Sequence, residues 1–144
     1  MAPTRLDDLP TWLLSRSAAR AHQLLAAAFA EAGTRGYHYR LLAALADLGP
    51  ASQASLGRST EIDGSDVVAA LAQLESEGLV ERSPDPDDKR RRVVSITAAG
   101  KRRLKELDRV VAIVQTELTA PLSTAEREEL VRLLGLLAGA ERKD

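Results

Sequence analysis

The chain of 144 residues contains no cysteine, and this absence removes several kinds of chemistry at once. Such a chain can form no disulfide, no thiol nucleophile and no metal cluster built on cysteine ligands. A lack of disulfides is typical of proteins in reducing compartments. We therefore expect an intracellular protein with a cytoplasmic location.

Long hydrophobic runs are also missing. The longest uninterrupted apolar run extends from Leu24 to Ala30, whereas a membrane-spanning helix needs about 20 apolar residues. The first apolar segment is interrupted by Ser15-Arg16-Ser17 and again by Arg20, so it does not match a signal peptide. We predict neither a membrane span nor a membrane partner.

The net charge is only -1, which by itself does not favour a polyanionic partner. The charge is unevenly distributed, however, because the segment from Glu81 to Lys105 holds nine Lys or Arg residues and four Asp or Glu residues. That segment has a net charge of +5, and the remainder of the chain is -6 by difference. A local basic stripe is the feature that indicates a nucleic-acid partner, although such a run is often only a solvated surface.

The residues that follow Asp63 have a helical pattern. Asp63 is suited to cap the helix start, and Val67, Leu71 and Leu74 recur with the spacing of one buried stripe. Gly78 then marks a typical helix end. Further helices are predicted over 37–48 and 52–60, so that residues 52–77 form a helix–turn–helix pair.

The opposite face of this helix carries short or polar side chains, namely Ser65, Asp66, Ala69 and Gln73. In a DNA major groove, Gln73 can pair with adenine, Ala69 can contact a thymine methyl group and Asp66 can accept from a cytosine amine. The alternative is that all four are solvated, with Asp66 only compensating the helix dipole. We favour DNA contact for this face because of the segment that follows.

A hairpin pattern comes directly after the helix. Residues 79–83 and 93–96 read as two short strands, and residues 84–88 are prolines and aspartates that we expect in a turn and not inside a sheet. The turn is followed at once by four basic residues: Lys89, Arg90, Arg91 and Arg92. Such a helix can enter a major groove while the basic hairpin reaches the flanking backbone or minor groove.

These linked motifs resemble the MarR (multiple antibiotic resistance regulator) family of winged helix–turn–helix transcription factors. The family's wing signature is Asp, any residue, Arg and a hydrophobic strand ending in Leu-Thr; here it is Asp88-Lys89-Arg90 followed by residues 93–97. The family's Leu-Glu-x-x-Gly-Leu-Val is present as residues 74–80. The resemblance covers nearly the whole chain. It implies a homodimer that binds a palindromic double-stranded DNA operator, most often as a ligand-responsive repressor.

The resemblance also implies roles for the wing residues. Arg90 matches the arginine that enters the minor groove, and Asp88 matches the aspartate that braces it. Lys89, Arg91 and Arg92 are then further DNA contacts, although the family usually has a small residue where Arg91 stands. The alternative is an exposed loop salt bridge, which contributes less than about 1 kcal/mol. The absence of cysteine excludes the thiol-based oxidant sensing of part of the family.

Aromatic residues are few, and all four of them precede Arg40, together with both histidines. In the MarR family this part of the chain borders the inducer cleft, and aromatic walls with few polar groups suit a small aromatic or phenolic effector. Packing in the core or in a dimer explains the same residues, so both interpretations stay open. No metal site and no cofactor are predicted. The candidate ligand-binding residues are Trp12, His22, Tyr37 and Tyr39.

The two ends of the chain hold more apolar surface than the middle unit needs, which indicates packing against a second copy. Residues 10–32 and 98–140 are the predicted helical dimerisation region, and residues 37–97 the DNA-binding lobe, of one domain spanning 1–144. Apolar residues in the helix after Thr97 are spaced 3, 4, 3, 4, as in a seam for a partner helix. Ser123 opens a capping box for the last helix. The predicted dimer-interface residues are Leu13, Leu104, Leu107, Val111, Val114, Leu118, Leu130 and Leu134.

The predicted fold is therefore mainly α with a small β-hairpin wing (α+β), a winged helix–turn–helix flanked by N- and C-terminal dimerisation helices. Enzyme activity is not expected, because there is no Gly-rich phosphate loop and no nucleophile–base arrangement, and no catalytic residue is assigned. Asp85, Asp87 and Asp88 lie in a proline-marked turn and not in a magnesium site. The alternative function is a helical dimerisation or adaptor protein without specific DNA binding, which would not need a basic hairpin tip.

Overall fold

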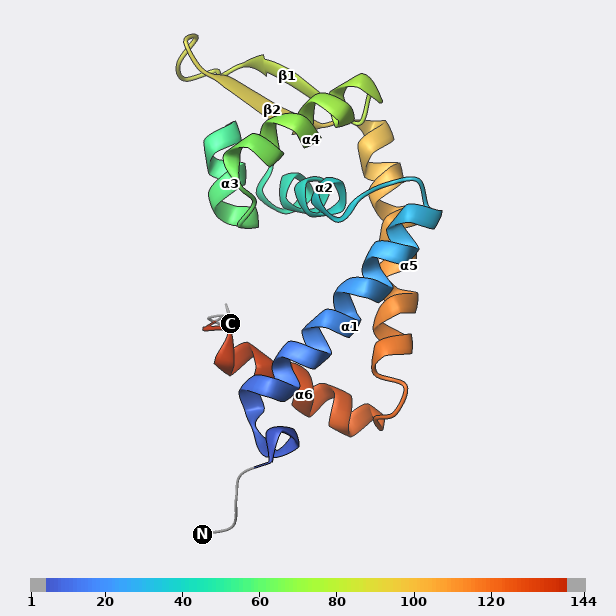
Figure 1. The fold of residues 1–144 in the computed structure, drawn as a ribbon. Coiled ribbons are helices and arrows are strands. Elements are labelled where there is room, and N and C mark those ends of the chain that lie inside the picture. Colours follow the sequence, from blue (N-terminus) through green and yellow to red (C-terminus); the bar gives the residue numbers. More distant parts are fainter. Residues whose placement is uncertain (1–4, 140–144) are drawn as a thin grey trace.

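The computed structural model describes residues 5–139, which form helices and one β-hairpin (Figure 1). A short 3-10 helix η1 (Leu6–Asp8) comes first. It is followed by α1 (Pro10–Glu31), α2 (Gly36–Leu48), α3 (Gln53–Thr60), α4 (Gly64–Ser76), β1 (Val80–Pro84), β2 (Arg92–Ile96), α5 (Ala98–Leu118) and α6 (Thr124–Leu137). The predicted mainly α fold with a hairpin wing is confirmed. The predicted end of the last segment, Ala140, lies outside the described residues, as do 1–4 and 141–144.

Local sequence signals place the helix starts. Ser123 forms the predicted capping box with Glu126: Glu126 N–H donates to Ser123 Oγ at 3.1 Å, and Ser123 N–H donates to Glu126 Oε1 at 2.9 Å. Ser52, Asp63 and Thr97 likewise accept a backbone N–H at the starts of α3, α4 and α5. A cap satisfies an N–H that would otherwise have no partner in the first turn.

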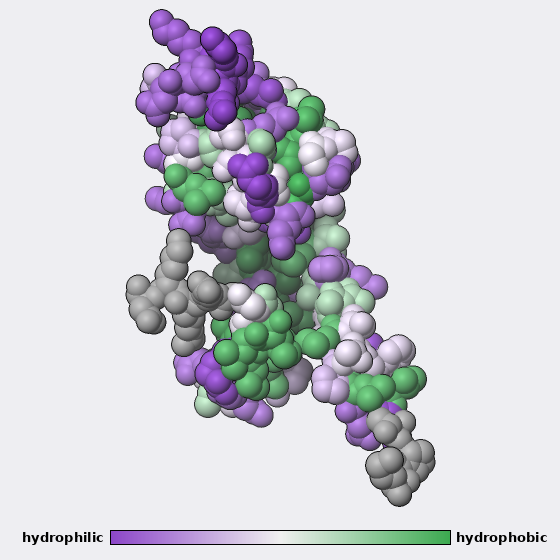
Figure 2. All heavy atoms as spheres, turned by 90° about the vertical axis from the view of Figure 1, so that its left-hand side faces the viewer, coloured by the Kyte–Doolittle hydropathy of each residue, from purple (hydrophilic) through white to green (hydrophobic). Residues whose placement is uncertain are grey.

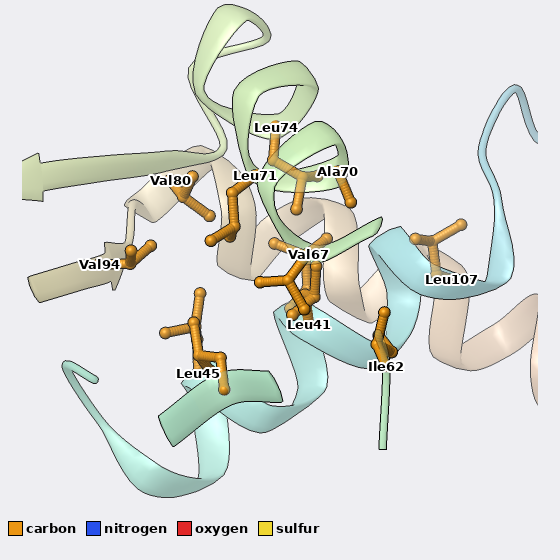
Figure 3. Packing of buried hydrophobic residues seen from close by; sticks show 12 residues of the cluster. Leu41, Leu45, Ile62, Val67, Ala70, Leu71, Leu74, Val80, Val94 and Leu107 are labelled. Atoms are coloured by element: carbon orange, nitrogen blue, oxygen red, sulfur yellow. The ribbon is translucent and has the colours of Figure 1, made fainter. Parts of the chain in front are cut away.

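The main hydrophobic core lies in a lobe made of α2, α3, α4 and the hairpin (Figure 3). Its side chains come from every element of the lobe because each helix turns its apolar stripe inward. α5 contributes Leu107, which closes the core at the side where that helix leaves the lobe. The fully buried large side chains are Leu41, Leu42, Leu45, Leu56, Leu71, Leu74, Leu107, Val67 and Val80.

The hairpin corrects one expectation, because Pro84 belongs to a strand. β1 and β2 pair antiparallel, and Pro84 stands opposite Arg92 at the end of the ladder. Proline is tolerated there because the last residue of an edge strand need not donate to the sheet. The sequence also did not reveal that Ala51 pairs with Val94 on the other side of β2, through hydrogen bonds of 2.8 and 3.0 Å.

The long helices α1 and α5 pack side by side beneath the lobe (Figure 1). The Arg103 guanidinium on α5 donates to the Ala32 carbonyl at the end of α1, which joins the two helices where they meet the lobe. Val114, 3% exposed, lies where α5 packs against α1. The apolar stripe of α5 therefore already has a partner within the same chain.

This packing corrects two of the predicted dimer-interface residues. Leu107 is fully buried in the core of the lobe, and Val114 is buried beside α1, so neither is available to a second copy in this conformation. Periodicity predicts that a stripe is buried but cannot tell which helix covers it. Leu104, Val111, Leu118 and Leu130 are half-buried, whereas Leu13 and Leu134 are exposed.

Among the α-helices within residues 5–139, α6 alone has no buried residue. None of its residues is buried, and Leu136 and Leu137 are 69% and 70% exposed. On the face shown in Figure 2, hydrophobic side chains gather in the lower half of the molecule, whereas the wing tip is hydrophilic. Nothing within residues 5–139 covers these apolar side chains of α6.

No helix within residues 5–139 is long and apolar enough to cross a membrane.

Candidate nucleic-acid interface

The helix α4 divides its residues between the core and the solvent. Val67, Ala70, Leu71 and Leu74 are buried against the lobe. The four residues predicted to read bases are all exposed, and they are Ser65, Asp66, Ala69 and Gln73. Sequence reasoning missed other exposed residues on the outer surface of α4, since Val68, Ala72 and Ser76 also face solvent. The prediction named only four exposed positions of this helix and left these three out.

Two of the predicted base-reading side chains are held by neighbours. The Ser65 hydroxyl donates to Asp63 Oδ2 at 2.5 Å, and the Ser65 backbone N–H donates to the same oxygen at 3.2 Å. These bonds to Ser65 lower the pKa of the Asp63 carboxyl. Gln73 Nε2 donates to Glu77 Oε1 at 2.9 Å, one helical turn along. The Gln73 amide thus keeps a second N–H and its carbonyl oxygen for other partners.

The acidic residues of the wing shape its turn. Asp85 Oδ1 accepts the Asp87 backbone N–H at 2.9 Å, and Asp88 Oδ1 accepts the Arg90 backbone N–H at 3.0 Å. Such i to i+2 bonds are the side-chain turns that aspartate favours. The basic side chains Lys89, Arg90, Arg91 and Arg92 are all exposed, so the turn presents their charge to solvent.

The bracing of Arg90 stays a prediction for Asp88, which contacts Arg90 through the backbone. Its carboxylate accepts from the backbone of Arg90, not from the Arg90 guanidinium, and its Oδ2 lies 3.8 Å from Arg91 Nε. The geometry of the turn favours the nearer backbone N–H. The Asp88 carboxylate therefore pairs with Arg91. An exposed ion pair at this distance contributes little to stability.

Thr97 anchors the wing to the helices on both sides. Its hydroxyl donates to the Gly78 carbonyl at 2.7 Å and its backbone N–H donates to the Leu79 carbonyl at 3.0 Å, while the hydroxyl oxygen accepts from Gly100 N–H at 3.0 Å. A Cβ at Gly100 would lie 2.1 Å from the Leu79 carbonyl oxygen. The close approach therefore requires glycine at position 100, and it sets how the hairpin leaves α4.

A second link between wing and α4 was not foreseen from the sequence. Arg82 Nε on β1 lies 2.9 Å from Glu75 Oε2 on α4, without the alignment of a hydrogen bond. Because the ion pair is partly exposed, it contributes little to stability. It mainly holds β1 against α4.

The candidate ligand-binding residues are not brought together within one chain. Tyr39 packs against Phe29, with ring centroids 5.5 Å apart, and its hydroxyl donates to Asp108 on α5. Tyr37 is exposed at the start of α2. Trp12 and His22 are exposed along α1, and Trp12 lies about 28 Å along the helix axis from the end of α1.

A cleft of about 530 Å³ lies between α4 and the turn that joins α1 to α2. We call it the corner cleft. One wall is formed by Thr34, Arg35, Tyr37 and His38, and the opposite wall by Asp66, Ala69, Gln73 and Glu77 of the α4 region. The sequence had no signal for this cleft, because its two walls come from segments that are distant along the chain.

The charges in the corner cleft are mixed. Burial lowers the pKa of His38, and the nearby Arg35 lowers it further, while Glu77 acts in the opposite direction. The lowered pKa favours the neutral form of His38. Arg35 remains as the cation of this cleft.

Within residues 5–139, no group of three or more His, Cys, Asp or Glu side chains is placed to hold a metal ion.

Comparison with known proteins gives a consistent result. The model of the MarR family matches residues 33–91. The chain is 32% identical over 93 residues to the HTH-type transcriptional repressor NicR of Pseudomonas putida, which corresponds to 65% of this chain and 59% of NicR. The chain thus spans about three fifths of the length of such curated relatives.

Two solved structures extend the likeness to almost the whole chain. A probable transcriptional regulator from Pseudomonas aeruginosa superposes with a TM-score of 0.80 at 34% identity, covering 92% of this chain and 99% of that one. The PcaV transcriptional regulator from Streptomyces coelicolor, in complex with its natural ligand, superposes with a TM-score of 0.78 at 26% identity, covering 97% and 99%.

Proposed function

The chain belongs to the MarR family, and we propose from this that it is a transcriptional regulator that binds double-stranded DNA in a sequence-specific manner. In this proposal residues 37–97 form the DNA-binding lobe, and residues 10–32 with 98–140 form the dimerisation region of a homodimer. The operator is then palindromic, because two identical lobes related by a two-fold axis need a site of matching symmetry.

The observation that carries the proposal is the combination of α4 and the wing. A helix whose exposed face carries mainly short or polar side chains stands beside a hairpin whose tip is basic and exposed. The major groove is about 12 Å wide and admits a helix. In this proposal Gln73 reads adenine, Ala69 contacts a thymine methyl group, and Asp66 accepts from a cytosine amine. The wing arginines then contact phosphates or the minor groove.

The uncovered apolar surface supports a homodimer. Leu13, Leu134 and Leu136 are exposed on α1 and α6 in the isolated chain. Exposed patches of this kind are uncommon in monomeric proteins. A second copy is the partner that this proposal assigns to them, and it would bring two lobes to one face of the DNA.

Control by a small aromatic or phenolic effector is part of the proposal. NicR is named as a repressor, and PcaV was crystallised in complex with its natural ligand. An effector can release this protein from DNA only if it binds the free dimer more tightly than the DNA-bound dimer. The expected mode is repression that such a ligand relieves.

Selection of bound sequences from random duplexes, followed by a mobility-shift titration, tests the function. We expect an inverted repeat whose half-site centres lie about 10 base pairs apart, or a multiple of that spacing. Inserting five base pairs between the half-sites rotates one by about half a turn, and binding should weaken strongly. Undiminished affinity for that duplex contradicts the symmetric dimer, and failure to select any sequence favours the adaptor alternative.

A further inference from the structure

Two clefts flank α4 on opposite sides. The corner cleft lies along the side of Asp66, Gln73 and Glu77. On the other side, Val68, Ala72, Glu75 and Ser76 of α4 face Arg82 and Arg92 of the wing across a second cleft of about 620 Å³. With about 3.6 residues per turn, these two sets of residues point in different directions from the helix axis. The outermost surface of α4 therefore projects between two recesses.

This arrangement matches the surroundings of a helix in a major groove. An α-helix is about 10–12 Å across with its side chains, and the groove is about 12 Å wide. A helix that enters the groove is therefore bordered on both sides by a sugar–phosphate backbone. The wing and its arginines lie on one side of α4, so the second backbone must pass the corner cleft.

The corner cleft presents one uncommitted cation to that backbone. Arg35 is exposed, and within residues 5–139 it takes part in no ion pair of the described chain. Arg40, by contrast, donates to the Thr60 carbonyl at 2.9 Å and stacks over the Tyr37 ring at 5.7 Å. Arg40 thus stiffens the wall of the cleft, and Arg35 is free to move toward a partner.

We propose that the corner cleft is a second backbone-contact site for DNA, in which Arg35 binds a phosphate on the strand across the major groove from the wing. The proposal rests on the DNA-binding function proposed above. Asp66 and Glu77 repel phosphate and face the α4 side of the cleft. The phosphate is therefore held away from α4, at the wall that carries Arg35, and the carboxylates are left to face base amino groups.

Arg35→Ala in the full-length protein tests this site. Operator affinity is measured by fluorescence anisotropy over a series of salt concentrations. Each lost phosphate contact lowers the slope of log K against log salt by about 0.9, and a symmetric dimer loses two contacts. We expect the slope to fall by about 1.8, with equal weakening on operator and on random DNA. Arg35→Lys keeps the charge and should keep most of the slope.

The matched control is Arg5→Ala. Arg5 is an exposed arginine that precedes α1 and lies outside the segments assigned to the DNA-binding lobe and the dimerisation region. The first residue of α1 already lies about 33 Å along the helix axis from Ala32, so replacing Arg5 should leave the slope unchanged. Phosphate-ethylation interference on the same operator should show a phosphate that matters for the wild type and for Arg5→Ala but not for Arg35→Ala. Circular dichroism checks that each variant is folded.

The outcomes separate this inference from the proposed function. If the wild type binds no specific sequence, the proposed function itself fails. If the wild type binds its operator and Arg35→Ala retains the wild-type affinity, slope and interference pattern, only the inference is overturned. If Arg35→Ala binds DNA normally but no longer releases it in the presence of a hydroxybenzoate, the cleft is an effector site, and the inference is wrong.

Discussion

Tyr39 on α2 donates its phenolic hydrogen to Asp108 Oδ1 on α5 at 2.9 Å, a hydrogen bond that joins the lobe to the long helix leaving it. The two residues are 69 positions apart in the sequence, so only the fold brings them together. The Tyr39 ring also packs beside Phe29 of α1. One side chain of α2 therefore contacts both α1 and α5.

Replacing Tyr39 by Phe should lower the free energy of unfolding by about 0.5–1 kcal/mol at pH 8, because one partly exposed hydrogen bond is lost and the ring is kept. Burial, and then the bond to Asp108, raise the pKa of Tyr39 from 10.0 to about 12. The folded pKa is above the unfolded value, so this stabilisation is complete below pH 10 and is lost as the pH rises toward 12.

Urea unfolding of the wild type and Tyr39→Phe at pH 8 and at pH 11 measures this effect. The stability difference between the two proteins should shrink at the higher pH. Tyr37→Phe is the control, since Tyr37 is exposed and its ring is retained. A difference that is the same at both pH values would contradict the role of the hydroxyl.

Gly100→Ala should destabilise the protein severely, by about 3 kcal/mol or more, because the new Cβ would lie 2.1 Å from a backbone oxygen that cannot move aside. Gly64 begins α4 and has no atom within 4 Å of an added Cβ. Gly64→Ala should therefore be neutral or slightly stabilising. Thermal unfolding gives the melting temperatures of both variants. Similar melting temperatures would show that position 100 is not constrained as the structure indicates.

Gln73→Ala should relax the base preference at one position of each half-site, at a cost of about 1–3 kcal/mol if the contact is bidentate. Its effect should be confined to specific DNA, because the side chain is uncharged. Arg90→Ala is the contrasting variant: it removes a cation, so binding should weaken on all sequences and the salt slope should flatten. Competition binding with base-substituted operators and with random DNA distinguishes them. Equal losses of Gln73→Ala on both kinds of DNA would rule out base reading by Gln73.

Leu136→Glu should convert the proposed dimer into a folded monomer, because Leu136 is 69% exposed on α6 and a charge there opposes apolar association. Leu48→Glu, at a position 55% exposed on α2, should leave the dimer intact. Leu107→Glu should instead unfold the lobe, since it buries a charge in the core. Light scattering gives the molecular mass, and circular dichroism the fold. A wild type that is monomeric at micromolar concentration would refute the dimer.

Much of the candidate interface could be predicted because its signals are local. The caps Asp63 and Ser123 are read from residue type and position, and the structure confirms both. The buried stripe of α4 and the exposure of its opposite face follow from periodicity. The basic wing tip is likewise a property of adjacent residues. Its aspartates form the turn through hydrogen bonds to residues two positions away, which need no contact with distant segments.

Contacts between distant segments could not be predicted in the same way. The 3-4 spacing of α5 shows that one stripe is buried, but Leu107 is covered by the lobe and Val114 lies beside α1, in the same chain. Asp88 accepts from the Arg90 backbone N–H because of the detailed geometry of the turn, and a sequence motif does not specify that geometry.

The sequence by itself therefore determined the elements, their caps, the exposed face of α4 and the charge of the wing, because these depend on residues within a few turns or strand positions of one another. The tertiary structure alone decided what covers each apolar stripe and which side chains share a cleft. The corner cleft shows the reason, since Arg35 and Gln73 line one cleft only because α2 and α4 pack across one core. Burial is a collective property of the whole lobe, and no local pattern encodes which surfaces it brings together.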